Sequence, residues 1–410
     1  MSPVAALILS AIVLSAAFDL YLRRRQIGAV ARARARTPEA FRAFVTRAEH
    51  ERAADYAVAN ARFGAVAAAF DAAVAILWLT VLTAPLYALT ARLAEPGLSR
   101  SVLFVLVFGA VNGLLGLPFA IIRTFGIEAR FGFNRTTPRL FALDQIKAAA
   151  LQLAFGAPLL FAFFLLVAAL PRTWPLFGFA GAFLLVCALS VVIPLWIAPL
   201  FNAFRPLPES GLKARVEALL ARCGFAAKGL FVIDASRRSN HGNAYFAGFG
   251  RAKRIVFFDT LLERCSEDEI LSVLAHELGH YKLGHIMWRL VQTAVALAVL
   301  FAALGLAFGS DALARAFALP ADPAVVLTIV MIAAAPVARL AAPLFNLLSR
   351  RAEFEADAFA RDLLGAEPMA SALIRLSRDN LSTLTPDWLY AAFYYSHPPV
   401  PERVTRLAST

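Results

Sequence analysis

The feature that most constrains this chain is a series of apolar segments, each about as long as a bilayer is thick. A helix needs about 20 apolar residues to cross the hydrocarbon layer, and seven segments meet that requirement. Hydrophobic residues make up 60% of the chain and charged residues 17%, whereas soluble domains carry about 25% charged residues. We therefore expect a mainly α integral membrane protein with spans at 3–22, 64–89, 101–122, 148–170, 174–199, 290–309 and 324–347.

The distribution of arginines predicts how these spans are oriented. The first segment has no basic residue before it and three directly after it, Arg23, Arg24 and Arg25, which is the reverse of a cleavable signal peptide. The loops 23–62 and 125–147 and the stretch after 199 are rich in arginine, so we expect them in the cytoplasm and the N-terminus outside. This topology also accounts for the net charge of +12, so the expected partner is the bilayer and not nucleic acid.

The polar segments divide the chain into four expected parts. Residues 1–199 hold five spans with their loops, 200–289 a first catalytic part, 290–347 two more spans, and 348–410 a second catalytic part. Short strands are expected at 229–234 and 254–259, with a further candidate at 243–249. The three cysteines form no CxxC pair, so neither a disulfide framework nor a cysteine-ligated metal is expected.

A metal-binding motif lies in the first catalytic part. Ser266 and Glu269 form a capping box that starts a helix, and this helix carries His276-Glu277-Leu278-Gly279-His280. Histidines at i and i+4 present two nitrogens to one metal, and Glu277 can reach a water on that metal as general base. Zinc lowers the pKa of such a water to about 7. The motif is expected by chance roughly 0.004 times in this composition, which disfavours a plain surface helix.

A third ligand is expected in the second catalytic part. Glu353 and Asp357 share a helix face, as a metal ligand and a hydrogen-bonding partner for a histidine would, while Glu355 is expected to point elsewhere into solvent. A plain acidic surface face is the alternative. Both motifs lie so close to apolar segments that the site falls within about 20 Å of the hydrocarbon layer. A protease placed there would act on membrane-anchored or membrane-inserted chains.

Six motifs make the sequence similar to the type 1 CaaX prenyl endopeptidases. They are HELGHYKLGH (276–285), NAYFAGF (243–249), RIVFFDTLL (254–262), RRAEFEADAFA (350–360), YYSHPPVPER (394–403) and FGFNRTT (131–137). The resemblance implies seven membrane helices that enclose a water-filled chamber, with a gluzincin-like zinc metalloprotease site near its cytoplasmic end. Members of this family remove the last three residues of prenylated C-a-a-X proteins, and some also cleave internally.

The resemblance also implies roles for individual residues. It makes Glu277 the base and assigns one zinc ion to three ligands: His276, His280 and Glu353. It further implies that Asn243 contacts the substrate backbone or the oxyanion, that His397 stabilises the tetrahedral intermediate, and that Arg403 orients the acidic groups.

Each of these assignments has a plainer alternative. His397 precedes Pro398-Pro399 and could be a turn residue, and Arg403 could be a surface arginine. His285 lies roughly 140° from His280 on a continuous helix, so we expect a structural histidine there and not a fourth ligand. His241 could line the cleft near Asn243.

Composition leaves the natural substrate open. Arginine outnumbers lysine 35 to 5, which is typical of bacteria with GC-rich genomes, and most bacteria have no C-a-a-X prenylation. In a bacterium the host would be the inner membrane, and quality control of misfolded membrane proteins is the alternative function. A transporter or receptor with a structural zinc is disfavoured, because such a zinc takes four protein ligands and no fourth is evident.

Overall fold

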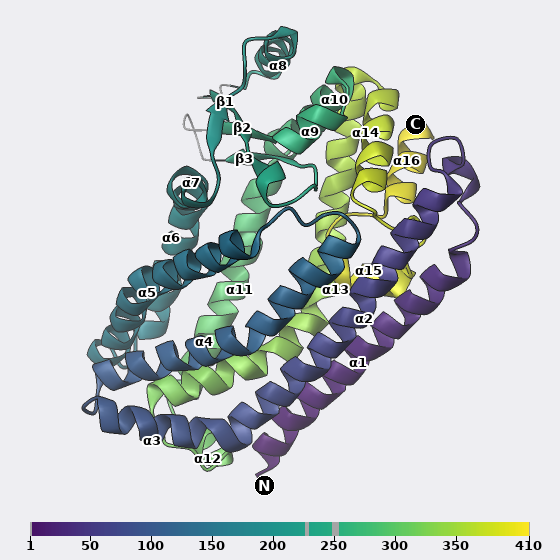
Figure 1. The fold of residues 1–410 in the computed structure, drawn as a ribbon. Coiled ribbons are helices and arrows are strands. Elements are labelled where there is room, and N and C mark those ends of the chain that lie inside the picture. Colours follow the sequence, from purple (N-terminus) through teal and green to yellow (C-terminus); the bar gives the residue numbers. More distant parts are fainter. Residues whose placement is uncertain (1, 226–228, 248–253, 410) are drawn as a thin grey trace.

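The structure is a computed structural model, and it describes residues 2–225, 229–247 and 254–409. Helices dominate it, and one small sheet lies at the end of the molecule opposite the N-terminus (Figure 1). The membrane-spanning helices run between these two ends.

Within the described residues, seven helices are long and apolar enough to cross a membrane, as the sequence predicts. Each covers one predicted segment to within one residue, and most extend beyond it at the start or the end, so the apolar length underestimates the helices. They are formed by α1 (Pro3–Ala33), α2 and α3 (Arg47–Leu77 and Thr83–Leu93), α4 (Leu98–Ile121), α5 (Pro138–Ala169), α6 and α7 (Trp174–Val192 and Ala198–Phe201), α11 (His285–Phe308) and α13 (Pro323–Leu364). Single π-helical turns join α2 to α3 and α6 to α7.

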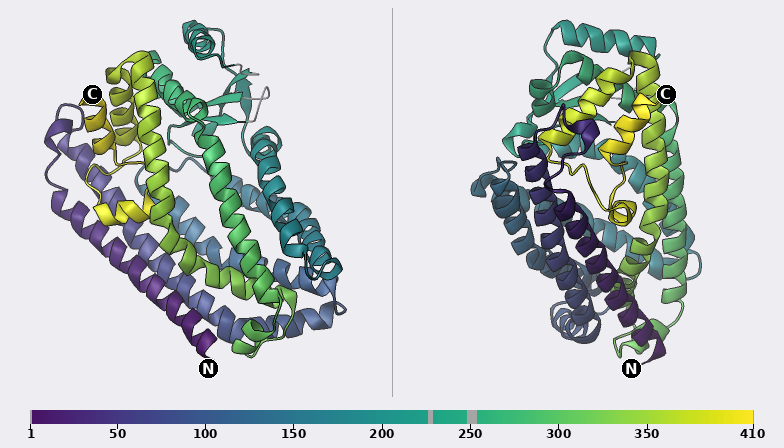
Figure 2. Two further views of the ribbon diagram at one scale, coloured as in Figure 1. Left: turned by 180° about the vertical axis from the view of Figure 1, so that it is seen from behind. Right: turned by 90° about the vertical axis from the view of Figure 1, so that its right-hand side faces the viewer.

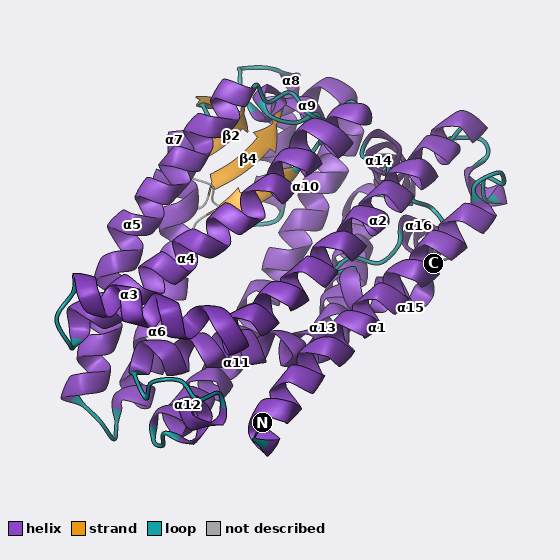
Figure 3. Ribbon diagram, turned by 60° about the horizontal axis from the view of Figure 1, so that its bottom comes forward, coloured by secondary structure: helices purple, strands orange, loops and turns teal. Residues whose placement is uncertain are grey.

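The remaining helices lie mostly with the sheet. They are α8 (Gly211–Arg222), α9 (Asp259–Arg264), α10 (Glu267–Lys282), α14 (Ala366–Asp379), α15 (Trp388–Tyr394) and α16 (Val400–Ala408), and a short α12 (Ala312–Ala316) lies at the other end. Figures 2 and 3 show the sheet and α10, α14 and α16 gathered at the end away from the N-terminus. An odd number of spans requires this separation, because the chain must leave the membrane on the side opposite to its entry.

The sheet has the strand order β1-β2-β4-β3. The predicted strands at 229–234 and 254–259 are confirmed as β2 (Gly229–Ile233) and β4 (Arg254–Phe258), which pair in parallel. The third candidate forms β3 (Ala244–Ala247), antiparallel to β4 at the edge of the sheet; its last two positions lie outside the described residues. The sequence gives no alternation to reveal β1 (Phe204–Pro206), a three-residue strand that pairs with β2.

One apolar core joins the segment before the last two spans to the segment after them. Phe257 of β4 and Leu274 and Leu278 of α10 are fully buried in the same cluster as Met369 of α14 and Leu407 of α16. These two parts of the chain therefore fold together, although two membrane helices separate them in sequence.

Helix α13 links this core to the membrane without a break. Its 42 residues begin after Asp322, whose side chain accepts a hydrogen bond from the amide of Ala324, and end at Gly365, which has a φ of +91°. At 1.5 Å per residue the helix is about 63 Å long, roughly twice the hydrocarbon thickness. It carries its membrane span and the EFEAD motif on one continuous backbone.

A buried charge cluster connects α13 to α1 within the membrane region. Asp19 is fully buried, and its carboxylate lies 2.8 Å from the guanidinium of Arg339 and 3.2 Å from that of Arg23. Arg339 also donates to the hydroxyl of Tyr394, at 3.1 Å. A cavity of about 490 Å³ adjoins these groups and Asp71. Charged groups at this depth are costly unless they are paired or face water.

We predict that Asp19→Leu destabilises the protein, because it leaves Arg339 without its carboxylate at membrane depth. Removal of one partner of a buried pair costs about 3–5 kcal/mol, and we expect about 2–3 kcal/mol here because Arg339 is one-third exposed. Thermal unfolding in detergent measures the change. Asp311→Leu is the control, since among the described residues the exposed Asp311 pairs with the exposed Arg315 alone; equal effects of the two substitutions would contradict the role of the cluster.

Candidate active site

The helix of the HExxH motif is fixed firmly at its start. Ser266 and Glu269 form the predicted capping box, with hydrogen bonds of 3.3 and 2.8 Å between side chain and backbone. Glu269 is buried and also accepts hydrogen bonds from Ser371 and Arg375 of α14. One carboxylate therefore both caps α10 and holds it against α14, which sets the direction in which the motif points.

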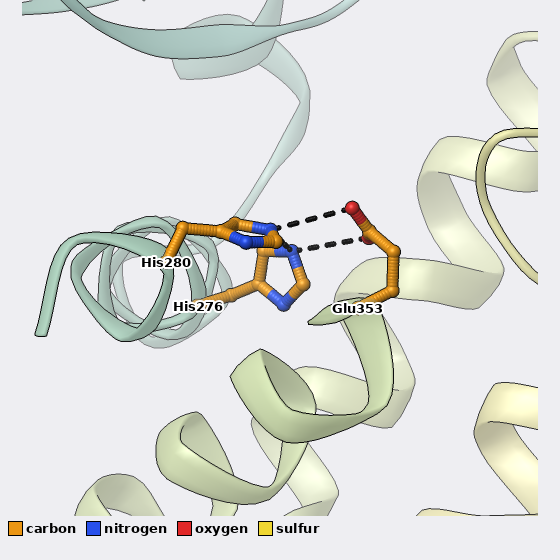
Figure 4. Close-up of side chains that lie close together, drawn as sticks. All are labelled: His276, His280 and Glu353. Atoms are coloured by element: carbon orange, nitrogen blue, oxygen red, sulfur yellow. Dashed lines mark hydrogen bonds and ion pairs between the residues drawn. The ribbon is translucent and has the colours of Figure 1, made fainter. Parts of the chain in front are cut away.

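Two histidines and a glutamate meet between α10 and α13. Figure 4 shows His276 and His280 extending from α10 toward Glu353 of α13. The two Nε2 atoms lie 3.2 Å apart, and they lie 3.4 Å and 3.3 Å from the Glu353 oxygens Oε2 and Oε1, respectively. Glu353 is 1% exposed, so its carboxylate is shielded from bulk water where it meets the two imidazoles.

This geometry fits a metal ion. In a tetrahedral site with bonds of about 2.0–2.1 Å to nitrogen and oxygen, neighbouring donor atoms lie roughly 3.3 Å apart, which matches the three separations. Glu353 Oε2 is buried and makes no hydrogen bond to the described residues, and a buried carboxylate oxygen normally has such a partner. The predicted group His276, His280 and Glu353 is therefore a metal-binding group in its arrangement and its chemistry.

Asp357 and Arg403 form a buried support behind His276. Asp357 Oδ1 lies 2.9 Å from His276 Nδ1, the nitrogen that faces away from the donor group. The Arg403 guanidinium donates to both Asp357 oxygens, at 2.7 and 2.5 Å, and lies 3.5 Å from Glu353. Arg403 is 7% exposed, so the surface-arginine alternative does not describe it. The structure thus brings together five of the predicted site residues.

The other three predicted residues lie around this group in different ways. Glu277 makes no hydrogen bond or ion pair with the described residues, and burial raises the pKa of its carboxyl above the usual range. His397 is 62% exposed, and its Nε2 lies 3.3 Å from Glu353 Oε1. Asn243 is exposed directly before β3, and its side chain accepts a hydrogen bond from the amide of Ala244. The described contacts link His397, but not Asn243, to the metal-binding group.

Glu355 is exposed and His285 lies outside the metal-binding group, as expected, but the two side chains also contact each other. Glu355, expected to point into solvent, is half-exposed and lies 3.0 Å from His285 Nε2, while His285 Nδ1 lies 2.9 Å from His280 Nδ1. The cause is Gly284, whose φ of +74° ends α10 and turns the chain into α11. The angle of roughly 140° between His280 and His285, which assumes one continuous helix, therefore does not describe their relative position. The Leu283-Gly284 pair is the sequence signal of this break, since glycine commonly ends helices in that conformation.

The two remaining histidines have partners elsewhere. His241 stacks on Phe133 with ring centroids 4.0 Å apart and contacts the side chain of Asn380. His50 is buried, and its Nε2 lies 3.1 Å from the carbonyl oxygen of Ala33. Neither joins the metal-binding group.

A cavity lies beside the site, between α1, α2 and the segment 380–403. It has a volume of about 480 Å³, and His397 and Arg403 line it together with Tyr390 and Asn60. Tyr390 and Asn60 also line the cavity beside Asp19.

The paired histidines, the half-buried glutamate beside them and the third donor, a carboxylate from a membrane helix, define a membrane-embedded metallopeptidase. Comparisons with known proteins agree. The family model "Peptidase family M48" matches residues 206–410, and the model "CAAX prenyl protease N-terminal, five membrane helices" matches residues 26–203. The chain belongs to the CAAX prenyl protease 1 family of M48 peptidases.

Similar proteins come from plants and fungi. The chain is 41% identical over 293 residues to the CAAX prenyl protease 1 homolog of Oryza sativa subsp. japonica, covering 71% of this chain and 69% of that protein. It is 34% identical over 326 residues to CAAX prenyl protease 1 of Saccharomyces cerevisiae, covering 75% and 72%. The crystal structure of S. mikatae Ste24p superposes with a TM-score of 0.92 at 28% identity, covering 99% of both chains.

We predict that Gly279→Ala weakens the metal-binding group. A Cβ at this position would lie 3.1 Å from Ala356 Cα and 3.3 Å from its carbonyl oxygen, so α10 and α13 would have to move apart. Overpacking of this kind costs about 1–3 kcal/mol. Thermal unfolding and the metal retained against a chelator measure both consequences. Gly113→Ala is the control, because a Cβ there meets nothing within 4 Å; indistinguishable variants would show that the close approach is unimportant.

Proposed function

We propose that this metallopeptidase binds one zinc ion at His276, His280 and Glu353 and cleaves the C-terminal three residues from prenylated C-a-a-X proteins. The observation that carries the peptidase part is the set of three converging donors with Glu277 beside them. The names of the relatives support the substrate class, and so does the cavity beside the site, between α1, α2 and the segment 380–403.

Glu277 is the general base in this proposal. Zinc at these donors would supply Lewis acidity to a water and to the scissile carbonyl. The Glu277 carboxylate takes a proton from the attacking water as its oxygen adds to the carbonyl carbon, and then returns that proton to the leaving amide nitrogen. Partial burial suits this role, because a raised pKa brings the carboxyl closer to the operating pH. Within the described residues no hydrogen bond competes for the Glu277 carboxylate.

His397 and Asn243 complete the substrate-facing groups. His397 is exposed next to Glu353, so its imidazole N–H can turn toward the oxygen that becomes negative. Asn243 stands before β3, and β3 is an edge strand whose outer backbone groups can pair with an extended substrate. Both assignments rest on position.

Asp357 and Arg403 act as positioning residues. Asp357 accepts a hydrogen bond from His276 Nδ1 and so directs Nε2 toward zinc, and Arg403 holds Asp357 by two hydrogen bonds. The shared apolar core supports the proposed division, in which 200–289 and 348–410 form one catalytic body and 1–199 and 290–347 form the membrane part.

The catalytic body faces the cytoplasm in this proposal, and the N-terminus lies outside. The arginine-rich loops support this orientation through the positive-inside rule. The N-terminus also lies at the end of the molecule opposite the sheet (Figure 1). The membrane helices would enclose the chamber that the family implies, and the two cavities, which share Tyr390 and Asn60 in their linings, would form part of it.

We predict that Glu277→Gln retains zinc but loses about 10²–10⁴-fold in hydrolysis, because the base is removed while the ligands stay. His276→Ala should instead lose zinc. Metal analysis of the purified variants and cleavage of a peptide substrate separate the two effects. Turnover by Glu277→Gln at the wild-type rate would remove this residue from its role, and full zinc occupancy in His276→Ala would refute the ligand assignment.

The substrate class is tested with a farnesylated C-a-a-X peptide and its unprenylated twin, each given to wild type and to Glu277→Gln. We expect wild type to release the last three residues of the prenylated peptide and the variant to release none. Equal cleavage of both peptides by wild type would retain the peptidase and favour general membrane-protein proteolysis. Absence of cleavage with zinc bound would contradict the proposed activity.

A further inference from the structure

The two histidines of the metal-binding group have supports of different kinds. His276 Nδ1 reaches the carboxylate of Asp357 directly. In the part of the chain that the structure describes, no carboxylate contacts His280 Nδ1. This atom lies 2.9 Å from His285 Nδ1, and His285 Nε2 lies 3.0 Å from Glu355 Oε2. His280 is therefore also linked to a carboxylate, but through the imidazole ring of His285 and not directly.

The hydrogen atoms on this chain of groups have one consistent arrangement. If His280 Nε2 offers its lone pair to a metal, its Nδ1 carries the hydrogen and donates it, so His285 Nδ1 must accept. The hydrogen of neutral His285 is then on Nε2, where it is donated to ionised Glu355, which can only accept. Each link requires the next, so the carboxylate fixes the tautomers of both rings.

Local structure holds this chain of groups in place. Gly284 turns the backbone back at the end of α10, so His285 begins α11 and is 6% exposed. Glu355 lies two residues after Glu353 on α13, and Arg351 one turn earlier lies 3.0 Å from its other oxygen. The relay thus connects three helices and is anchored at the surface by an ion pair.

We propose that His285 and Glu355 form a positioning relay that fixes the tautomer and orientation of His280 and thereby raises the affinity of the site for zinc. This proposal rests on the assignment of His280 as a zinc ligand. Outer hydrogen-bonding partners of metal-bound histidines typically contribute 10–100-fold in metal affinity. The same effect is expected here through an intervening ring.

The test measures zinc affinity of the full-length detergent-solubilised protein by competition with a chelator. We expect His285→Phe to weaken zinc binding by roughly 10–100-fold and Glu355→Leu by about 10-fold. Glu355→Gln should retain most of the affinity, because its amide oxygen still accepts from His285. The double variant His285→Phe/Glu355→Leu should be no weaker than His285→Phe alone, since both residues act through His280.

A matched control comes from the same helix. Asp362→Asn removes an exposed carboxylate of α13 that pairs with Arg361 and lies two turns from Glu355, and it should leave zinc affinity unchanged. The absorption spectrum of the cobalt-substituted protein gives an independent readout, which should change in His285→Phe and not in the control.

The outcomes separate this inference from the proposed function. Wild type that fails to bind zinc would refute the metal assignment itself. Wild type that binds zinc while Glu355→Leu binds it equally well would overturn the relay. Because Glu355 is half-exposed, its variants are expected to fold. They therefore test the relay even if His285→Phe fails to fold. Losses of stability without a change in zinc affinity would show a structural role only.

Discussion

The close packing of α10 against α13 is the contact on which the site depends. Two donors come from one helix and the third from the other, so the distance between the helix axes fixes the size of the metal site. Gly279 permits this approach, since its Cα faces the backbone of Ala356. The shared apolar core packs the same two helices together, and the capping carboxylate Glu269 holds α10 against α14.

The site also depends on a balance of buried charge. Glu353 and Asp357 are both buried, and Arg403 is the single buried cation beside them among the described residues. This leaves an excess of negative charge that favours a divalent cation, and it places the acids where they also orient the histidines. The same two buried acids therefore both attract the cation and hold the histidine ligands in place.

Much of this arrangement follows from local sequence signals. Apolar length predicted the seven spans, the Ser266–Glu269 box predicted the start of α10, and i, i+4 spacing paired the histidines. The sequence did not predict the hydrogen-bonding partners behind His280. His285 comes close to His280 because of the left-handed turn at Gly284, and Glu355 is brought to His285 by the packing of α13. Such contacts depend on how three helices meet, and no periodicity within one segment encodes them.

The order of the metal-binding residues along the chain has a consequence for biosynthesis. His276 and His280 precede α11, and Glu353 stands at the far end of the membrane region of α13. Ribosomal synthesis therefore produces the first two ligands long before the third, and the third reaches them only after both membrane helices have been inserted as a hairpin. The metal-binding group is therefore complete only in a chain whose α11 and α13 already lie side by side.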